Sequence, residues 1–398
     1  MPAVLFYVQH LLGIGHLTRA RAICEALAVA GCDVHLVAGG RPFAAGLPCG
    51  VRMIQLPPIH VADAAMKPLL DGEGKPIDDA YREQRRNQLL AAFESITPAA
   101  VVFETFPFGR RALHFELLPL LERIATARPR PLVVASVRDI LQRRRNPERE
   151  RETLELARRA FDAVLVHGDP RFIRLDETFP LASELGIPVC YTGFVAASEA
   201  AKPAADGERS EIVVSGGGGA VGFELMRGAL AARSLSHTGS ARWRLLVGTN
   251  ASDAELEILS RDAVKGVIVE RARTDFPALL ARASVSVSQA GYNTVLDAVR
   301  SGARPVLVPF AEHGETEQRT RANRLRELDL AIVIDGLETL GADLASAIDA
   351  AAAKKDWGEW NFDCDGAARS AAIIMDMLER KSAPTSAGVG IPDRAERA

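Results

Sequence analysis

Cysteine is scarce in this sequence, which holds five cysteines in 398 residues. They are scattered and odd in number, and no two of them have the C-x-x-C spacing of a zinc site or a redox motif. The sequence therefore predicts free thiols in a reducing compartment and gives no sign of a disulfide framework. The cysteines are Cys24, Cys32, Cys49, Cys190 and Cys364.

Long apolar runs are also absent, since none approaches the roughly 18 residues of a membrane-spanning helix. The apolar start of the chain lacks the basic residues and the small-residue cleavage site of a signal peptide, and Gly13, Gly15 and His16 interrupt it. We expect a first strand and loop there, and a cytoplasmic protein. The arginines of residues 143–151 are compatible with a peripheral contact to anionic lipid, although the neighbouring glutamates favour a solvated helix face.

Neither sign of charge dominates, because 48 basic and 51 acidic residues give a net charge of -3. This balance offers no electrostatic support for a nucleic-acid partner, and we predict none. Hydrophobic residues make up 48% of the chain, which is enough apolar material for more than one core. At about 100–200 residues per domain, the length predicts two or three domains.

Short apolar runs alternate with longer amphipathic stretches along the whole chain. The runs are rich in Val, Ile and Leu without polar alternation, which is typical of strands buried on both faces of a parallel sheet. Strand–helix–strand repetition predicts right-handed βαβ units and an α/β fold. The predicted strands are Val4–Val8, Val34–Val37, Ala100–Phe103, Leu132–Ser136, Ala163–Val166, Val189–Thr192, Ile212–Ser215, Trp243–Val247, Val267–Val269, Val285–Val287, Pro305–Val308 and Ile332–Ile334.

The repetition breaks once, at Ala196–Ser210, which has the composition of a linker. About six predicted strands lie on each side. The sequence therefore predicts two doubly wound domains, residues 1–196 and 210–365. A C-terminal helix over 366–380 and a disordered tail over 381–398 are expected to follow.

A second irregular stretch, Pro57–Asp79, carries prolines, glycines and few periodic apolar residues. Long insertions of this kind are often substrate-facing loops, and a mobile surface excursion is the alternative.

Polar residues gather where the predicted strands end, and open parallel sheets bind ligands beyond these carboxyl ends. Gly216–Gly219 lies between a strand and a predicted helix at Phe223–Ala232. Glycine lets backbone N–H groups approach an anion closely, and the helix N-terminus adds positive potential, so we predict a diphosphate site. A flexible tight turn is the alternative. The pattern fits neither G-x-G-x-x-G nor G-K-[ST], so nicotinamide and P-loop chemistry are not indicated.

A second strand-to-helix turn, Ser288–Thr294, offers donors at another helix N-terminus. Asp297 lies one turn further on, where an acid could accept two hydrogen bonds from a ribose diol. Taken alone, an exposed acid near a helix N-cap is the simpler interpretation.

His16 lies in the glycine-flanked loop after the first predicted strand, facing the expected cleft. Imidazole titrates near neutrality and can take a proton from an attacking hydroxyl, so a catalytic role is predicted beside a merely structural one. Glu104 and Asp139 each follow a strand and could orient His16 or act in its stead. The sequence does not decide between these two carboxylates.

The second half of the chain resembles the nucleotide-sugar-binding domain of GT-B glycosyltransferases, most closely the family 28 C-terminal domain. The first half resembles the N-terminal domain of the same superfamily, and its motifs look like those of a bacterial group of predicted glycosyltransferases. The resemblance covers nearly the whole chain. It is carried by Gln289–Asp297, Gly302–Pro305, Pro309–Phe310, Glu317–Gln318 with Asn323, Gly13-x-Gly15-His16-Leu17-x-Arg19, Tyr7–His16 and Phe103–Arg110.

The resemblance implies two Rossmann-like domains facing across a cleft, with a nucleotide-sugar as co-substrate and neither metal nor other cofactor. It assigns the diphosphate to the two glycine turns, the ribose to Asp297, the base to the backbone near Arg271 and the sugar hydroxyls to Glu317 and Gln318. Gln289 stands where many relatives have His or Arg, and Asp297 where Glu is more usual. The donor-binding residues so implied are Gly217, Gly218, Arg271, Gln289, Gly291, Asn293, Thr294, Asp297, Glu317 and Gln318.

The expected function is metal-independent, inverting transfer of a hexosyl group from a nucleotide-sugar, a uridine diphosphate sugar by resemblance, to an acceptor hydroxyl. His16 and Glu104 are the expected catalytic residues, and closure about Ala196–Ser210 would bring the substrates together. A lipid-linked acceptor and a polysaccharide are both compatible with the sequence. The alternatives are a nucleotide-sugar hydrolase or epimerase of the same fold, and a non-catalytic sugar-nucleotide-binding protein. The sugar, the acceptor and the oligomeric state do not follow from the sequence.

Overall fold

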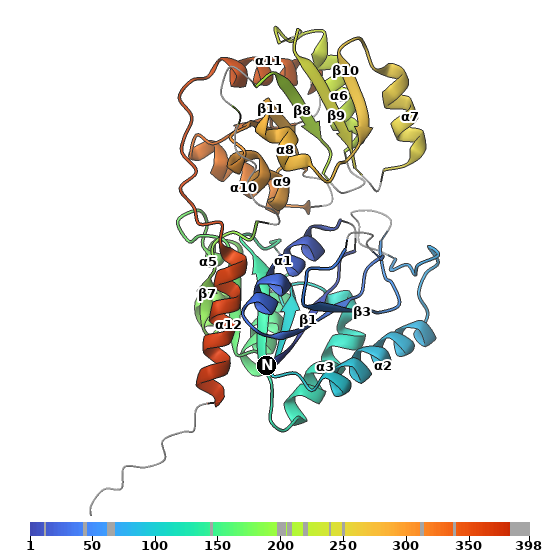
Figure 1. Cartoon of the computed structure of the whole chain (residues 1–398), viewed down its shortest axis with the longest axis vertical. Helices are drawn as coiled ribbons and strands as arrows, with labels where there is room; N and C mark the ends of the chain where they lie inside the picture. The colour runs from blue at the N-terminus through green and yellow to red at the C-terminus, as the bar shows by residue number, and fades with distance from the viewer. Residues whose placement is uncertain are drawn as a thin grey trace, which may run out of the picture.

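Two parallel sheets, one in each half of the chain, organise the structure of the protein, which is a computed structural model. Figure 1 shows the two halves stacked, with the second domain above the first. The described residues are 1–11, 13–42, 46–61, 68–143, 146–196, 204, 209–217, 222–238, 240–248, 251–310, 314–336 and 340–382.

The first sheet has seven strands in the order β3-β2-β1-β4-β5-β6-β7. Its central strands are buried on both faces, and separate apolar cores lie above and below them. Its strands are β1 (Ala3–Val8), β2 (Asp33–Ala38), β3 (Val51–Gln55), β4 (Ala100–Glu104), β5 (Leu132–Arg138), β6 (Ala163–His167) and β7 (Val189–Tyr191). Its helices are α1 (Gly15–Val29), α2 (Asp79–Ile96), α3 (His114–Thr126), α4 (Pro147–Ala160) and α5 (Leu175–Thr178), with 3-10 turns at Arg111–Leu113 and Pro180–Glu184.

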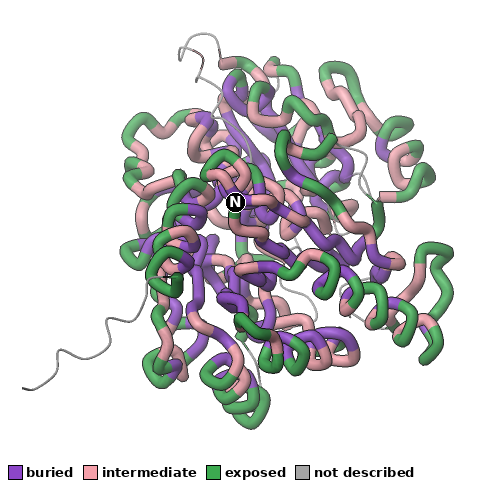
Figure 2. The backbone as a smooth tube through the Cα atoms, turned by 60° about the horizontal axis from the view of Figure 1, so that its bottom comes forward, coloured by how far each residue is buried: buried purple, intermediate pink, exposed green. Residues whose placement is uncertain are grey.

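The second sheet has six strands in the order β10-β9-β8-β11-β12-β13. Figure 2 shows the strands of both sheets as the buried centre of the molecule and the helices as its more exposed shell. The strands are β8 (Glu211–Ser215), β9 (Arg242–Val247), β10 (Val267–Arg271), β11 (Ala283–Ser288), β12 (Arg304–Leu307) and β13 (Ile332–Val333). The helices of this domain are α6 (Phe223–Arg233), α7 (Asp253–Asp262), α8 (Phe276–Ala281), α9 (Tyr292–Arg300), α10 (Glu317–Glu327) and α11 (Leu340–Ala353), and the chain ends in α12 (Gly366–Ser382).

The predicted α/β fold of two doubly wound sheets is confirmed, and each predicted strand is present. One strand, β3, was not predicted. It lies at the edge of its sheet and pairs with β2 alone, so Arg52 and Met53 are exposed to solvent. The continuous apolar run that marks a strand buried on both faces is therefore missing from its sequence.

The last helix, α12, returns to the first domain, where it packs against α1 (Figure 1). Its apolar face, including Ala371 and Ile374, completes the core beneath β1. The return is fixed by backbone hydrogen bonds from Phe194 N to Asp363 O (2.7 Å) and from Gly366 N to Phe194 O (3.0 Å). The helix extends past residue 380 to Ser382, and residues 383–398, predicted as a tail, lie outside the described residues.

An apolar cluster joins the two domains at the point where the chain leaves the second domain and leads to α12. Phe194 of the first domain packs against Tyr292 of the second at a ring-centroid distance of 5.9 Å and against Trp360 at 5.1 Å. Phe172 and Phe362 continue the cluster. The domains are therefore held together at one side by a shared core, in addition to the predicted linker, most of which lies outside the described residues.

Candidate functional site

The strand registers bring the predicted polar residues to one edge of each sheet. In the first sheet Glu104 pairs with Ser136, and Arg138 pairs with His167. In the second sheet Ser215 pairs with Ser288, which places the two glycine turns side by side. Because all these strands are parallel, the turns that follow them meet at their carboxyl ends, where an open sheet binds its ligands.

His16 and Glu104 form a direct pair on the first-domain side. Nδ1 of His16, in the first turn of α1, lies 2.9 Å from Oε1 of Glu104 at the end of β4. Arg19, one turn later in α1, also donates to Glu104 Oε1. The Glu104 side chain is fully buried, whereas 15% of the His16 side chain is exposed. The imidazole is thus the member of the pair that a ligand can reach.

A buried hydrogen-bonded chain continues behind Glu104. Ser136 Oγ donates to Glu104 Oε2 at 2.7 Å and lies 2.8 Å from Nε2 of His167, whose Nδ1 lies 2.9 Å from Oγ1 of Thr192. Burial, together with the charge of Arg19, lowers the pKa of His167 to about 3, so this histidine is neutral. Burial opposes ionisation of Glu104, but Arg19 and His16 outweigh it and hold the pKa of its carboxyl far below the ordinary range. Glu104 is therefore a fixed carboxylate.

The electrostatic surroundings keep His16 neutral. Burial lowers its pKa well below 6.5, and the positive charges of Arg110 and Arg138 lower it further, while Glu104 acts in the opposite direction. With Nδ1–H assigned as the donor to the carboxylate, Nε2 carries the free lone pair. A neutral imidazole held in this tautomer by an acid is able to accept a proton.

Asp139, the other carboxylate considered for this role, is occupied elsewhere. Its two oxygens accept hydrogen bonds from Arg321 of α10, Oδ2 from Nε at 3.0 Å and Oδ1 from Nη2 at 2.6 Å. Both side chains are buried, so the pair ties the end of β5 to the second domain. Of the two carboxylates, Glu104 contacts His16.

Glu317 and Gln318, predicted to bind the donor sugar, are engaged within the protein. Glu317 Oε1 lies 2.7 Å from Nη1 of Arg138 and 3.0 Å from Nη2 of Arg321, so its carboxylate belongs to the same charged contact between the domains. Gln318 Oε1 accepts a hydrogen bond from Phe310 N at 3.1 Å. A sugar ligand would have to share these groups with their present partners.

The two glycine turns of the second domain differ in how much of them the structure describes. Gly217 has a left-handed backbone with a φ of 68°, and a Cβ on Gly222 would lie 2.8 Å from the Cα of Gly216. Both positions therefore need glycine for the tight turn into α6. Gly218, also predicted to bind the diphosphate, lies outside the described residues.

The N-terminus of α9 holds the predicted phosphate-binding turn, and it faces the N-terminus of α1. A Cβ built on Gly15 would lie 3.3 Å from Asn293 Nδ2, so the two helix starts are in contact across the domains. Gly291 is the N-cap of α9, and Thr294 lies in its first turn. Within the described part of the chain, the buried atoms Asn293 Oδ1 and Ser288 Oγ have no hydrogen-bond partner. Two positive helix ends converge here, and the Ser288 hydroxyl is able to donate a hydrogen bond, which suits an anionic ligand.

Tyr292 joins the domains at the same point, a role that the sequence did not reveal. Its hydroxyl accepts a hydrogen bond from Val195 N at 2.8 Å and donates one to His167 O at 3.0 Å. The guanidinium carbons of Arg19 and Arg321 lie 5.4 and 5.6 Å from its ring centroid. A tyrosine inside a glycine-rich motif gives no sequence signal for such a contact, because its partners lie in the other domain.

Asp297 lies in α9, partly buried, with no side-chain hydrogen bond to the described residues. Burial raises the pKa of its carboxyl to about 6, although the nearby charge of Arg300 acts in the opposite direction. A carboxyl that loses water without gaining a donor is energetically costly, and a ligand hydroxyl would relieve this cost. Gln289, just before this helix, is hydrogen-bonded or otherwise paired in the structure.

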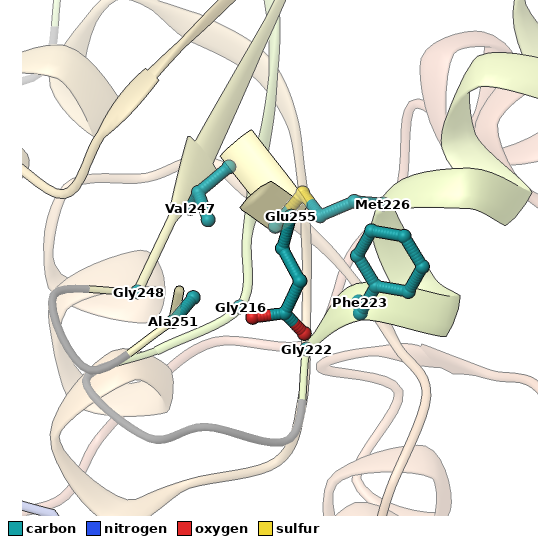
Figure 3. A pocket seen from close by; sticks show the side chains of 8 residues that line it. All are labelled: Gly216, Gly222, Phe223, Met226, Val247, Gly248, Ala251 and Glu255. Carbon is teal, nitrogen blue, oxygen red and sulfur yellow. The ribbon is translucent and has the colours of Figure 1, made fainter. Parts of the chain in front are cut away.

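Figure 3 shows a small pocket beside the first glycine turn, at the carboxyl ends of β8 and β9. Arg271 braces its wall, since Nη1 donates to Ala251 O at 2.5 Å and to Gly248 O at 3.2 Å. The Glu255 carboxylate points toward Gly216 and Gly222 (Figure 3), which makes the pocket better suited to hydroxyl groups or a base than to a phosphate. The lining residues are Gly216, Gly222, Phe223, Met226, Val247, Gly248, Ala251 and Glu255.

A second pocket lies on the first domain, where β1, β2 and β3 end. It combines basic and apolar side chains, and Leu47 and Met53 in its wall are exposed. Parts of the Pro57–Asp79 stretch lie close by, fixed by hydrogen bonds from Arg85 Nη1 to Pro57 O (2.5 Å) and from Tyr81 Oη to Pro58 O (2.8 Å). The pocket is lined by His10, Leu17, Arg21, Ala38, Arg41, Leu47, Met53 and Gln55.

Among the described residues, no three His, Cys, Asp or Glu side chains gather in a way that could hold a metal ion. The chain contains an Asp-x-Asp string at Asp363–Asp365, where the chain returns to the first domain. Asp363 is ion-paired with Arg369 at 2.5 Å and accepts a hydrogen bond from Asp365 N at 2.8 Å. In the described ranges, no helix is long and apolar enough to cross a membrane.

Comparisons with known proteins support the resemblance seen in the sequence. The profile of the glycosyltransferase family 28 C-terminal domain matches residues 212–364. No curated protein matches the chain. Solved structures that are similar over nearly their whole length include CalG4, MurG and UGT2. CalG4, the calicheamicin glycosyltransferase, has 18% identity and a TM-score of 0.58, with 95% of this chain and 94% of that chain covered.

MurG of Acinetobacter baumannii has 14% identity and a TM-score of 0.54, with 96% and 100% of the two chains covered. UGT2 of Phytolacca americana, in complex with UDP-2-fluoro-glucose and pterostilbene, has 13% identity and a TM-score of 0.57, with 96% and 95% covered. These likenesses establish the fold. The family match identifies residues 212–364, in the second domain, as a glycosyltransferase family 28 C-terminal domain, and the chain as a whole has the GT-B fold of these glycosyltransferase structures.

Proposed function

We propose that the protein transfers a sugar from a uridine diphosphate sugar to an acceptor hydroxyl, with inversion at the anomeric carbon and without a metal ion. The observation that carries the proposal is the neutral His16 imidazole, held by Glu104 and placed beside the N-terminus of α9. The choice of uridine is supported by the similar UGT2 structure, which holds a uridine diphosphate sugar analogue.

His16 acts as the general base. Its Nε2 takes the proton of the acceptor hydroxyl while that oxygen forms a bond to the anomeric carbon and the bond from this carbon to the diphosphate oxygen breaks. The electron pair leaves with the uridine diphosphate. Glu104 accepts the Nδ1 hydrogen and stabilises the imidazolium that forms, without taking up the proton itself. A single displacement of this kind inverts the anomeric carbon.

The leaving diphosphate gains negative charge at the N-terminus of α9. The N–H groups at this helix start, the unsatisfied Ser288 hydroxyl and the N-terminus of α1 supply hydrogen-bond donors and fixed dipoles there. Such groups can stabilise the developing charge in place of a metal ion. The pocket of Figure 3 takes the base end of the donor, and Asp297 accepts the ribose hydroxyls.

A panel of nucleoside diphosphates and their sugars tests this proposal. We expect a uridine compound to raise the melting temperature of the wild type by mass action, and Asp297→Ala to abolish this effect. The configuration of the transferred sugar, followed by NMR, should be opposite to that of the donor. The absence of stabilisation by any nucleotide, or retention of configuration, would contradict the proposal.

The same assay separates transfer from hydrolysis. His16 could also activate water, so a nucleotide-sugar hydrolase would release the sugar at a rate that added hydroxyl compounds do not change. For the proposed transferase, an acceptor must increase the rate of uridine diphosphate release and appear in the product. Binding of the donor without turnover under any acceptor would instead indicate a sugar-nucleotide-binding protein.

A further inference from the structure

The loop after β4, Thr105–Arg110, is tightly constrained beside His16. Thr105 and Arg110 have left-handed backbones, with φ of 70° and 61°. Residues other than Gly and Asn seldom adopt this conformation. Thr105 N donates to Ser136 O at 2.7 Å, and Thr105 Oγ1 lies 3.2 Å from His16 Nδ1. A Cβ on Gly109 would lie 2.6 Å from Thr105 Cγ2. Backbone of this kind persists where the surrounding structure fixes it, and it often serves a site.

Arg110, at the end of this loop, has no direct ion pair within the described residues. Its Nε is buried and lacks a hydrogen-bond partner there, and the carboxylate of Glu104, which already binds Arg19, acts on its charge without contacting it. Arg138 lies close enough for mutual repulsion, and the charge of Arg110 reaches both His16 and His10. Arg138 has Glu317 as its partner at 2.7 Å. Of these two arginines, Arg110 is thus the one without an ion pair within the described residues.

The position of Arg110 indicates which ligand it meets. It belongs to the first domain, whereas the turns proposed for the donor belong to the second. Its electrostatic neighbour His10 lines the first-domain pocket and contacts Arg41 O at 3.1 Å. The loop that ends at Arg110 contacts His16 through Thr105 Oγ1, so an anion bound by Arg110 would lie on the first-domain side of the site, near His16.

We propose that Arg110, assisted by Arg138, binds a phosphate or carboxylate group of the acceptor and thereby positions its hydroxyl at His16. The inference rests on the proposed transfer reaction and specifies its acceptor as an anionic hydroxyl compound. Guanidinium groups suit this role because they offer planar pairs of donors to phosphate and carboxylate oxygens. Arg110 is a specificity-determining residue in this account.

Inorganic phosphate titrated into the wild type by calorimetry, with uridine diphosphate present at saturation, tests for a second anion site. We expect phosphate to bind under these conditions, and Arg110→Gln to weaken it roughly tenfold or more, the loss expected when a charged hydrogen bond is removed. Arg111→Gln is the matched control, since Arg111 is exposed and paired with Glu152. Its affinity for phosphate should equal that of the wild type.

Several outcomes would overturn the inference. Phosphate that competes with uridine diphosphate would place the anion in the donor site, and equal phosphate affinity in Arg110→Gln and the wild type would remove Arg110 from the site. No binding to the wild type at millimolar phosphate would mean that no such site exists. Arg110→Lys, which keeps the charge but loses the paired donors, should fall between the wild type and Arg110→Gln, and it serves if Arg110→Gln does not fold.

Matched pairs of hydroxyl compounds, with and without a phosphate or carboxylate, extend the test to transfer. The anionic member should have the higher kcat/KM in the wild type, and Arg110→Gln should lose this preference. A preference for the neutral member would contradict the inference. If uridine diphosphate itself does not bind, the proposed donor fails, but phosphate titration without it still reports on Arg110, so the two failures are distinguishable.

Discussion

Nδ1 of His16 lies 2.9 Å from Oε1 of Glu104, although the two residues are 88 positions apart in the sequence. The parallel pairing of β1 with β4 explains this proximity, because both strands end at the same edge of the sheet and α1 begins just beyond it. Arg19 and Ser136 complete the surroundings of the carboxylate. The pair is therefore preorganised by the fold before any substrate binds.

Replacing Glu104 by Gln should lower kcat by roughly 100-fold or more, because the amide can neither fix the Nδ1–H tautomer nor stabilise the imidazolium. Binding of uridine diphosphate, measured by thermal stabilisation, should change little. Glu122→Gln, on the exposed face of α3, is the control and should behave like the wild type. Unchanged turnover in the Glu104 variant would remove this residue from the mechanism.

The acid side of the pH profile of kcat/KM should lie well below pH 6.5, because burial and the charges of Arg110 and Arg138 lower the pKa of His16. Activity requires the neutral imidazole, so it is lost as the pH falls through this lowered pKa. Arg110→Gln removes one of the opposing charges, and the acid side should move to higher pH. If the acid-side loss of kcat/KM had its midpoint above pH 6.5, or if Arg110→Gln did not shift this midpoint, the ionisation of His16 would not control the acid side of the profile.

Asp297→Asn tests the ribose-binding site through both stability and binding. The folded state raises the pKa of this carboxyl from 3.8 to about 6, so stability should fall as the pH rises through this interval and stay lower above it. At pH 8 the neutral amide should gain up to about 3 kcal/mol, at about 1.4 kcal/mol per pKa unit. Denaturant unfolding measures this gain, and nucleotide titration should show weaker binding. A less stable variant with normal nucleotide binding would contradict both arguments.

Tyr292→Phe should destabilise the protein by about 1–3 kcal/mol, because Val195 N and His167 O would each lose a buried hydrogen-bond partner. Tyr81→Phe, which removes one hydrogen bond to Pro58 O at a partly buried site, is the control and should cost less. Urea unfolding of the two variants provides the comparison. An equal or smaller loss for Tyr292→Phe would show that its hydroxyl does not join the domains.

Much of the fold was predictable because central parallel strands such as β1 and β4 are continuous apolar runs, and a single linker interrupts their repetition. Edge strand β3 was not predictable in this way. It pairs with β2 alone, and its exposed residues interrupt the apolar run that marks a buried strand. Residues adjacent to strand ends, such as His16 and Glu104, could be predicted as a cluster from topology alone. The contact of His16 with Glu104, and that of Asp139 with Arg321, depend on the tertiary structure and could not be predicted from the sequence.

Contacts between the domains could not be predicted, because no local pattern encodes them. The motif around Glu317 predicts a contact with the donor sugar, and it does not reveal that the Glu317 carboxylate contacts Arg138 of the first domain. Tyr292 lies within the predicted phosphate-binding turn, and this motif does not reveal that its hydroxyl contacts the backbone of His167 and Val195 in the first domain. Arg110 gave no signal of its own, since its role depends on a backbone conformation and on the absence of an acidic partner within the described chain.

A comparison of His16→Ala with the wild type, using the donor that stabilises the wild type, tests the role of His16 most directly. The turnover rate and the affinity for uridine diphosphate are measured on the same preparations. We predict that the variant binds uridine diphosphate with near wild-type affinity and loses transfer by at least roughly 100-fold, since a general base typically contributes that much. Wild-type turnover by the His16 variant would contradict the assignment of His16 as the base that activates the acceptor.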